Sequence, residues 1–247
     1  DRITLNCSKS SQYLSALLMI APVLPQGLTI TVADGCLVSR PYVNLTLAVM
    51  RAFGIEVYDE NFVYKVPGGQ NYQAGDYLVE VDATQASYFW AAAAIVKGAV
   101  LVRDISLNTS QGDIIFVELL AEMGCEVNPR AEGLEVSCYG RLKPFAADLS
   151  QTPDIVPTLA VVAAFADGES VLQNVENLRY KECDRLEAVI DGLTVMGIEA
   201  RFENNNLYIK GGQPKGGTIR TYNDHRIAMS FAVGGLGVSG QVIENPQ

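Results

Sequence analysis

Three positively charged side chains stand at or near the first turns of expected helices: Lys181, Arg185 and Arg226. The N-terminus of a helix carries a partial positive charge, so a cation is locally unfavourable there. The same helix end offers free backbone N–H groups, which bind phosphate and carboxylate groups. The planar guanidinium groups of the two arginines add paired donors that fit such anions. The placement therefore favours a binding site for an anion over a solvated helix end.

The other expected helix starts are also polar, and local explanations of them stay open. Ordinary N-capping accounts for most serines and aspartates at such positions. His225 is the only histidine, and taken alone it is better explained as a surface or core residue. The segment KECDR also fits a solvated first turn with charge pairs three and four residues apart. The polar residues at the remaining starts are Ser10, Ser11, Gln12, Ser39, Tyr42, Asp82, Asp113, Asp154 and Asp224.

The composition weighs against several functional classes. Hydrophobic residues make up 49% and charged residues 19% of the 247-residue chain, as in an ordinary globular protein. The apolar run at residues 88–96 is too short to span a bilayer, so no membrane association is expected. The formal net charge of -10 argues against nucleic acid as the main partner. Five scattered cysteines without a C-x-x-C pair predict a reduced, cytoplasmic compartment and no zinc site.

An internal repeat of roughly seventy residues runs through the chain. In each repeat a helix-like apolar run ends in a glycine and is followed by a β-rich run. The glycines that close these runs are Gly27, Gly98, Gly168 and Gly240. A second helix in the same phase precedes a strand and its hairpin partner. The glycines that close this second set are Gly54, Gly124 and Gly197.

One repeat therefore consists of helix, strand, helix, strand and hairpin strand. We predict an α/β (α+β) fold in which helices cover one face of each sheet. Three repeats are nearly complete, and a fourth begins at His225. If the repeats pack with their helix starts pointing the same way, several anion-binding helix ends converge.

Seven segments, in this order, resemble the signatures of the 5-enolpyruvylshikimate-3-phosphate synthase (EPSP synthase) family. They are SSQYLSALLMIAP, LVSRPY, VEVDATQASYF, TSQGD, TPDIVPTLAVVAAFADG, NLRYKECDRL and YNDHRIAMSFA. Each segment alone is moderately specific. Seven in family order, covering the chain nearly end to end, are a strong match.

The resemblance implies a two-domain enolpyruvyl transferase-like fold of βαβαββ units, of which this chain carries about half. Residues 1–81 would complete the first globular domain, and residues 82–247 would form most of the second. By the same comparison, a family segment with a substrate-binding lysine, arginines and a glycine-rich stretch is missing before residue 1. A basic residue that binds phosphoenolpyruvate (PEP) is missing after Pro246. Cys183 stands where the family usually has threonine or serine.

The resemblance also implies an activity, the transfer of the enolpyruvyl group of PEP to the 5-hydroxyl of shikimate 3-phosphate. Asp154 matches the carboxylate that accepts the hydroxyl proton, and Lys181 and Glu182 match the pair that exchanges protons at C3 and at the hydroxyl or the leaving phosphate. Arg185 and Arg226 match PEP-binding arginines. The matches to shikimate 3-phosphate ligands, weaker for the last two, are Ser10, Ser11, Gln12, Ser39, Asn177, Tyr42 and His225. Gln12 would also reach PEP. The family needs no metal or organic cofactor, and glyphosate is an expected inhibitor.

Three other interpretations stay open. UDP-N-acetylglucosamine enolpyruvyl transferase shares the repeats and the chemistry, but the KECDR and NDHR segments and the paired serines favour the shikimate enzyme. An RNA 3′-phosphate cyclase-like protein is built on related units, but the acidic composition weighs against it. A third possibility is a non-catalytic fragment that needs the missing segments before it can bind or react.

Overall fold

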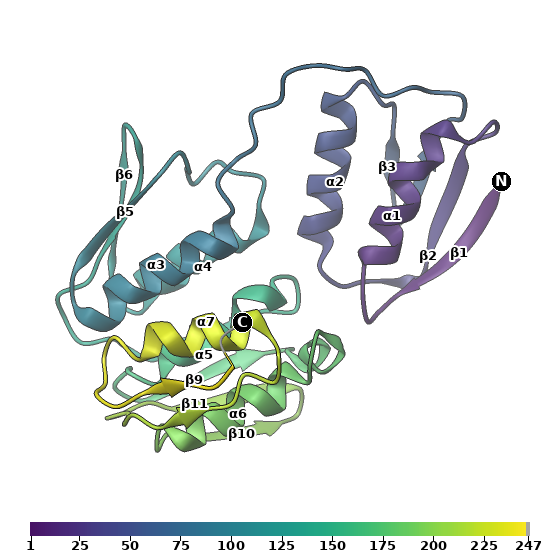
Figure 1. The fold of residues 1–247 in the computed structure, drawn as a ribbon. Coiled ribbons are helices and arrows are strands. Elements are labelled where there is room, and N and C mark those ends of the chain that lie inside the picture. Colours follow the sequence, from purple (N-terminus) through teal and green to yellow (C-terminus); the bar gives the residue numbers. More distant parts are fainter. Residues whose placement is uncertain (246–247) are drawn as a thin grey trace. The chain divides into compact units, whose positions relative to one another are not determined.

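The computed structural model describes residues 1–245 and divides into two compact units (Figure 1). Unit 1 is Asp1–Val79, and unit 2 begins at Glu80. The sequence placed a boundary near Asp82, whereas the two units divide between Val79 and Glu80. Within residues 1–245, no helix has the length and apolar character needed to cross a membrane.

Unit 1 is one mixed four-stranded sheet with helices packed on it (Figure 1). The strand order is β1-β2-β4-β3, with β1 and β2 parallel and the other neighbouring pairs antiparallel. Leu14 and Leu18 of the first helix and Leu47 of the second fill the core against the sheet. The elements are β1 (Arg2–Cys7), α1 (Gln12–Ile20), the 3-10 helix η1 (Ala21–Val23), β2 (Leu28–Leu37), α2 (Arg40–Ala52), β3 (Tyr58–Glu60) and β4 (Val63–Val66).

The first half of unit 2 pairs two helices with a three-stranded antiparallel sheet. The strand order is β5-β7-β6, so the hairpin strand β7 lies in the centre. The elements are α3 (Ala83–Val96), β5 (Ala99–Arg103), the 3-10 helix η2 (Gly112–Ile114), α4 (Ile115–Glu122), β6 (Glu126–Arg130) and β7 (Gly133–Ser137).

The second half of unit 2 repeats this plan and adds a further helix. Its four-stranded sheet has the order β10-β11-β9-β8, with β8 parallel to β9. The elements of the repeat are β8 (Ala146–Asp148), the 3-10 helices η3 (Pro153–Ile155) and η4 (Glu176–Tyr180), α5 (Val156–Ala163), β9 (Glu169–Gln173), α6 (Arg185–Val195), β10 (Glu199–Glu203) and β11 (Asn206–Lys210). The added elements are β12 (Thr218–Ile219), α7 (His225–Gly234) and β13 (Val242–Ile243).

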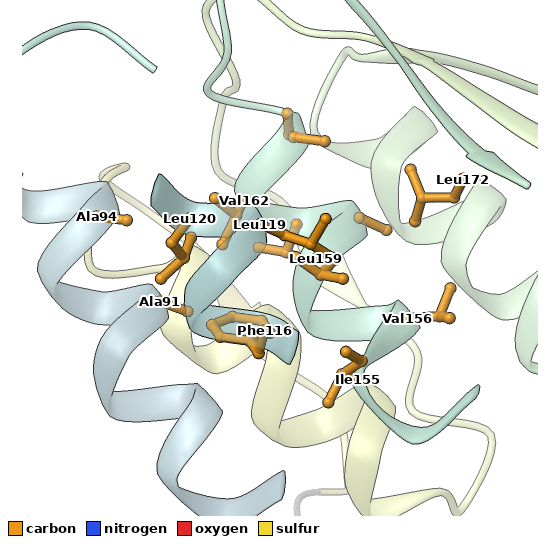
Figure 2. Packing of buried hydrophobic residues seen from close by; sticks show 14 of the residues in the cluster. Ala91, Ala94, Phe116, Leu119, Leu120, Ile155, Val156, Leu159, Val162 and Leu172 are labelled. Carbon is orange, nitrogen blue, oxygen red and sulfur yellow. The ribbon is translucent and has the colours of Figure 1, made fainter. Parts of the chain in front are cut away.

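One apolar core joins the two halves of unit 2 through their helices. Every residue of α5 is buried, which explains why its sequence is apolar on all faces. Figure 2 shows Phe116 of α4 and Leu159 of α5 in this cluster, together with Ala91 of α3. The small side chain at position 91 lets neighbouring helices approach closely. Within unit 2 this core therefore fixes α3, α5 and α7, the first helices of successive repeats, against one another.

The predicted α/β fold of repeated units is confirmed, and the helix lengths differ from prediction at two places. The helix expected across residues 10–27 ends at Ile20, and a short 3-10 helix that contains Pro22 follows. The helix expected from Asp154 begins at Val156, next to Pro157. Proline has no N–H to donate to a preceding turn, so regular helix stops before it or starts at it. At the end of α3, Lys97 rather than Gly98 takes the left-handed conformation, with φ 58°.

Candidate functional site

The starts of α5, α6 and α7 bring six charged side chains together in unit 2. We call this group the charged cluster. Four members stand in or beside the first turns of helices, and the segment before α6 supplies the other two. The members are Asp154, Lys181, Glu182, Arg185, Asp224 and Arg226. Three cations therefore face three carboxylates.

Arg185 is the centre of the cluster, because its guanidinium contacts all three carboxylates. Its Nε donates to Asp224 Oδ2 at 2.7 Å, and its Nη1 donates to Asp154 Oδ1 at 3.0 Å. Its Nη2 donates to Glu182 Oε2 at 2.5 Å. The Arg185 side chain is 1% exposed, so these ion pairs form in a poorly solvated environment. Only Glu182, at 54% exposure, faces solvent to a large extent.

Asp154 joins the two arginines and Lys181. Besides Arg185, it accepts from Arg226 Nη2 at 3.0 Å, and Lys181 Nζ lies 3.6 Å from its Oδ1. Burial by itself raises the pKa of Asp154, but the charges of Arg226, Lys181 and Arg185 together bring it below its ordinary value. Asp154 is therefore ionised at neutral pH and can accept a proton, although its lowered pKa makes it a weak base.

Asp224 was predicted only as a helix start, and the structure gives it a larger role. Its carboxylate caps α7 by accepting from the Arg226 backbone N–H at 2.8 Å. It also pairs with Arg185, and the Cys183 thiol donates to it at 3.6 Å. Burial, reinforced by the carboxylate of Asp224, raises the pKa of Cys183 to about 12, so this thiol stays protonated at neutral pH. A match to the motif NDHR could have pointed to Asp224, but no pattern in the sequence indicated its complete burial.

Tyr88 is a second residue that sequence reasoning left out of the site. It lies on α3 and is only 4% exposed. Burial raises the pKa of its hydroxyl, and the nearby positive charges of Arg226 and Arg185 act in the opposite direction. The segment VEVDATQASYF contains Tyr88 and was recognised as a family signature, yet its spacing gives no sign that the charges of the two arginines act on the Tyr88 hydroxyl.

Asn177 and His225 are the other predicted site residues in unit 2. Asn177 is buried, and its Nδ2 donates to the Ser150 carbonyl at 3.1 Å. Its Oδ1 finds no hydrogen-bond partner among the described residues 1–245. His225 begins α7 with a side chain that is 57% exposed, and its Nδ1 lies 4.0 Å from Asp224 Oδ1. Its ring is therefore oriented to solvent more than to the cluster.

The predicted site residues of unit 1 gather at the starts of α1 and α2. Ser11 precedes Gln12, the first residue of α1, and its hydroxyl donates to the Ser39 carbonyl at 3.5 Å. Ser39 has a left-handed backbone, with φ 56°, and precedes α2. The Tyr42 backbone N–H donates to the same carbonyl at 3.2 Å. The structure thus brings Ser11 and Ser39 together within unit 1.

Ser10 also lies at the start of α1 in unit 1. Its hydroxyl oxygen accepts the backbone N–H of Gln12 at 3.3 Å. Gln12 is exposed, and Ser10 is partly buried. These hydroxyl and amide groups are uncharged, so they can bind an anion only through hydrogen bonds and the helix dipole.

The two regions together indicate what the chain can do chemically. Arginine and lysine side chains can bind phosphate and carboxylate groups, and the carboxylates beside them can move protons. In the part of the chain that the structure describes, no group of three or more histidine, cysteine, aspartate or glutamate side chains could hold a metal ion. The charged cluster therefore has the groups for acid–base reactions of an anionic substrate.

Comparisons with known proteins agree with this chemistry. The family model of EPSP synthase (3-phosphoshikimate 1-carboxyvinyltransferase) matches residues 1–246. A 3-phosphoshikimate 1-carboxyvinyltransferase of Nostoc punctiforme is 42% identical over 245 residues, which cover 98% of this chain and 57% of the relative. One from Proteus mirabilis is 43% identical over 242 residues, covering 96% of this chain and 56% of the relative.

Solved structures give the same result. A structure of EPSP synthase from Acinetobacter baumannii superposes with a TM-score of 0.80 at 28% sequence identity. The match covers 100% of this chain and 59% of that structure. The chain thus spans somewhat more than half the length of the relatives that it matches.

Proposed function

The chain belongs to the EPSP synthase family, and from that premise we propose that it forms part of an enzyme that joins PEP to shikimate 3-phosphate. The observation that carries the proposal is the charged cluster. Arg185 and Arg226 converge on Asp154, at 3.0 Å each, beside Lys181 and Glu182. A family match without these groups would leave no candidate for binding an anion or moving a proton.

PEP carries a phosphate and a carboxylate, and the two arginines are the proposed ligands of these groups. Arginine suits both, because its planar N–H pairs match two oxygens at once. Glu182 lies on Nη2 of Arg185 at 2.5 Å and is the most exposed of the three carboxylates. An anion that approaches Arg185 would displace Glu182, and this would free the Glu182 carboxyl group for proton transfer at C3 of PEP.

The proposed reaction is an addition followed by an elimination. The 5-hydroxyl of shikimate 3-phosphate attacks C2 of PEP and gives its proton to Asp154, while C3 receives a proton from Glu182 or Lys181. The resulting tetrahedral intermediate loses phosphate as C3 gives its proton back. The arginines stabilise the negative charge on the phosphate and carboxylate throughout. The reaction so written needs no metal or organic cofactor.

The proposed ligands of shikimate 3-phosphate are the residues that match the family motifs. Hydroxyl and amide groups at helix starts suit its phosphate, because the helix dipole favours an anion there. Asn177 has a buried side-chain oxygen that can accept a hydrogen bond from a substrate hydroxyl. The proposed set is Ser10, Ser11, Gln12, Ser39, Tyr42, Asn177, Lys181 and His225.

The remaining parts of the proposal follow from family membership and composition. Residues 1–81 would complete the first globular domain of a longer enzyme, and residues 82–247 would form most of the second. Glyphosate is a proposed inhibitor, and the cytoplasm is the proposed location. Neither nucleic acid nor a membrane is a proposed partner, in keeping with the net charge of -10.

The first test is a nuclear magnetic resonance titration of the chain with shikimate 3-phosphate and PEP, with UDP-N-acetylglucosamine as control. We expect saturable shifts with the first two ligands only, and PEP should shift the side-chain signals of Arg185 and Arg226. Shifts with only the nucleotide sugar would assign the chain to the sister transferase and contradict the proposal. If neither ligand shifts any signal, the part of the Nostoc punctiforme relative that this chain does not cover is added in trans.

The second test measures phosphate release by the complemented enzyme. Glu182→Gln should lower kcat about 100-fold or more and change substrate binding little, because the proposed role is proton transfer. The matched control is Glu187→Gln, an exposed glutamate five residues further along. An unchanged kcat in Glu182→Gln would rule out the proton-transfer role of Glu182.

A further inference from the structure

Asp224 is the one carboxylate of the charged cluster that has no exposed surface. Both of its oxygens are occupied. Oδ2 accepts from Arg185 Nε at 2.7 Å and from the Cys183 thiol at 3.6 Å. Oδ1 accepts from the Arg226 backbone N–H at 2.8 Å and from Arg185 Nη2 at 3.4 Å. A carboxylate with four donors around it has no capacity left for a substrate.

These contacts tie two arginines to one group. Asp224 holds the Arg185 side chain from the side, through Nε and Nη2, and leaves Nη1 directed at Asp154. Through its cap it also fixes the first turn of α7, which carries Arg226. The guanidinium groups of both arginines then reach the two oxygens of Asp154, each at 3.0 Å. Asp224 therefore contacts the Arg185 guanidinium directly and contacts Arg226 through its backbone N–H.

Asp184 provides a natural comparison within unit 2. It also caps a helix, because it accepts from the Glu187 backbone N–H at 3.0 Å. It also pairs with an arginine, Arg179, at 2.8 Å. That pair lies at the surface, with side-chain exposures of 39% for Arg179 and 30% for Asp184. The two aspartates thus make the same kinds of contact, and they differ in burial and in what their arginines reach.

We infer that Asp224 is a positioning residue, which holds the Arg185 guanidinium and the first turn of α7 in the arrangement that binds PEP. The inference rests on the proposed function, because PEP is the ligand of that function. An arginine side chain has several rotatable bonds, and fixing them before the ligand arrives removes an entropic cost from binding. Neither the spacing of the motifs nor the family resemblance assigned Asp224 a role in the site.

The test compares Asp224→Ser with the matched control Asp184→Ser. Serine is itself a good N-cap residue, so both variants keep an oxygen at the helix start. Its side chain is too short to reach the neighbouring guanidinium, so both variants lose the arginine contact. Three quantities are measured: the hydrogen-exchange rate of the Arg185 Nε–H, the Kd of PEP and the Kd of shikimate 3-phosphate.

We expect Asp224→Ser to raise the Kd of PEP roughly tenfold and that of shikimate 3-phosphate less than about twofold. The Arg185 Nε–H should exchange at least about tenfold faster, because its buried acceptor is gone. Asp184→Ser should leave all three quantities unchanged. An unchanged Kd for PEP in Asp224→Ser, or equal losses for both ligands, would overturn the inference, since equal losses mean general damage to the fold.

Two further outcomes are decided by the exchange measurement alone. If the parent chain, complemented as above, does not bind PEP, the proposed function fails, and the exchange rates still report whether Asp224 orders Arg185. Equal exchange rates in the parent and in Asp224→Ser would then overturn the inference. If Asp224→Ser does not fold, the Arg185 Nε–H is followed in the parent during titration with PEP. Retained protection at saturation supports the inference, and lost protection overturns it because Arg185 would then have left Asp224.

Discussion

The helix N-termini of unit 1 and unit 2 differ in how they are capped. In the described residues of unit 1, neither Ser11 before α1 nor Ser39 before α2 makes a side-chain cap hydrogen bond. In unit 2, an aspartate caps α3, α6 and α7 with its side chain. The aspartates that do so are Asp82, Asp184 and Asp224.

The difference teaches how the two kinds of helix start can serve an anionic ligand. Where a serine precedes the helix without capping it, the partial positive charge of the helix N-terminus stays uncompensated. An incoming phosphate can then interact with this charge directly. Where an aspartate caps the helix, its carboxylate already compensates that charge. At such a start an arginine must supply the positive charge, and in unit 2 Arg185 and Arg226 stand at the starts of α6 and α7.

The largest effect is expected from removing the central cation of unit 2. Arg185→Leu leaves Asp224 buried without its main counter-charge, so the free energy of unfolding should fall by about 3–5 kcal/mol. The control is Arg201→Leu, which breaks the exposed pair with Glu169 and should cost less than about 1 kcal/mol. Urea unfolding followed by the fluorescence of Trp90, the only tryptophan, measures both. Equal losses would mean that burial of the ion pairs has no energetic consequence.

The next effect concerns pH. Burial alone would raise the folded-state pKa values of Asp154 and Asp224, but the positive charges and hydrogen-bond donors beside them bring both pKa values below the ordinary value of an aspartate. Such groups stabilise the fold fully above their unfolded pKa and lose this contribution as pH falls through the folded value. Unit 2 should therefore lose stability below about pH 4.

Urea unfolding of the parent chain and Asp224→Asn at a series of pH values, followed at Trp90, measures this loss. The variant keeps the shape of the side chain and removes one of the two titrating groups. Its stability should therefore fall less steeply below about pH 4 than that of the parent. An identical slope in the two proteins would show that Asp224 does not contribute to the acid sensitivity.

A smaller effect separates the two kinds of cap directly. Asp82 accepts the backbone N–H groups of Thr84 and Gln85, so Asp82→Ala should destabilise α3 by about 1 kcal/mol. Ser11 has no such contact, and Ser11→Ala should cost α1 less than about 0.5 kcal/mol. Native-state hydrogen exchange of the amides in each helix gives both values. A larger loss for Ser11→Ala would reverse the comparison between the units.

A small effect on stability is also expected for Glu182, the exposed carboxylate of the charged cluster. Glu182→Gln should change the free energy of unfolding by less than about 1 kcal/mol, since solvent screens an ion pair that is 54% exposed on one side. Asp224→Asn, which alters the buried partner of the same arginine, should cost more. Thermal unfolding of both variants at neutral pH makes the comparison. If Glu182→Gln proved the more destabilising, exposure would not be what distinguishes these two carboxylates.

Several features of the fold followed from the sequence because they depend on a few neighbouring residues. Gly54 was expected to close a helix, and it follows α2 in the left-handed conformation, with φ 80°. Gly27 is also left-handed, with φ 66°, but it lies in a turn beyond η1 and closes no helix. Asp82 was expected to begin a helix and caps α3. Asp113 was also expected at the start of a helix. In the structure its buried carboxylate instead accepts a hydrogen bond from the hydroxyl of Thr84, which lies on another helix. Its position in the sequence could not distinguish a cap from this contact.

The charged cluster shows what only the tertiary structure decided. The sequence named five of its six members, yet on position alone Asp154 was better explained as a helix cap. In the structure Asp154 pairs with Arg185, 31 residues away, and with Arg226, 72 residues away. The complete burial of Asp224 was not predicted at all. Caps and turns are set by local backbone geometry, whereas burial and ion pairing between distant residues arise only when α5, α6 and α7 pack together.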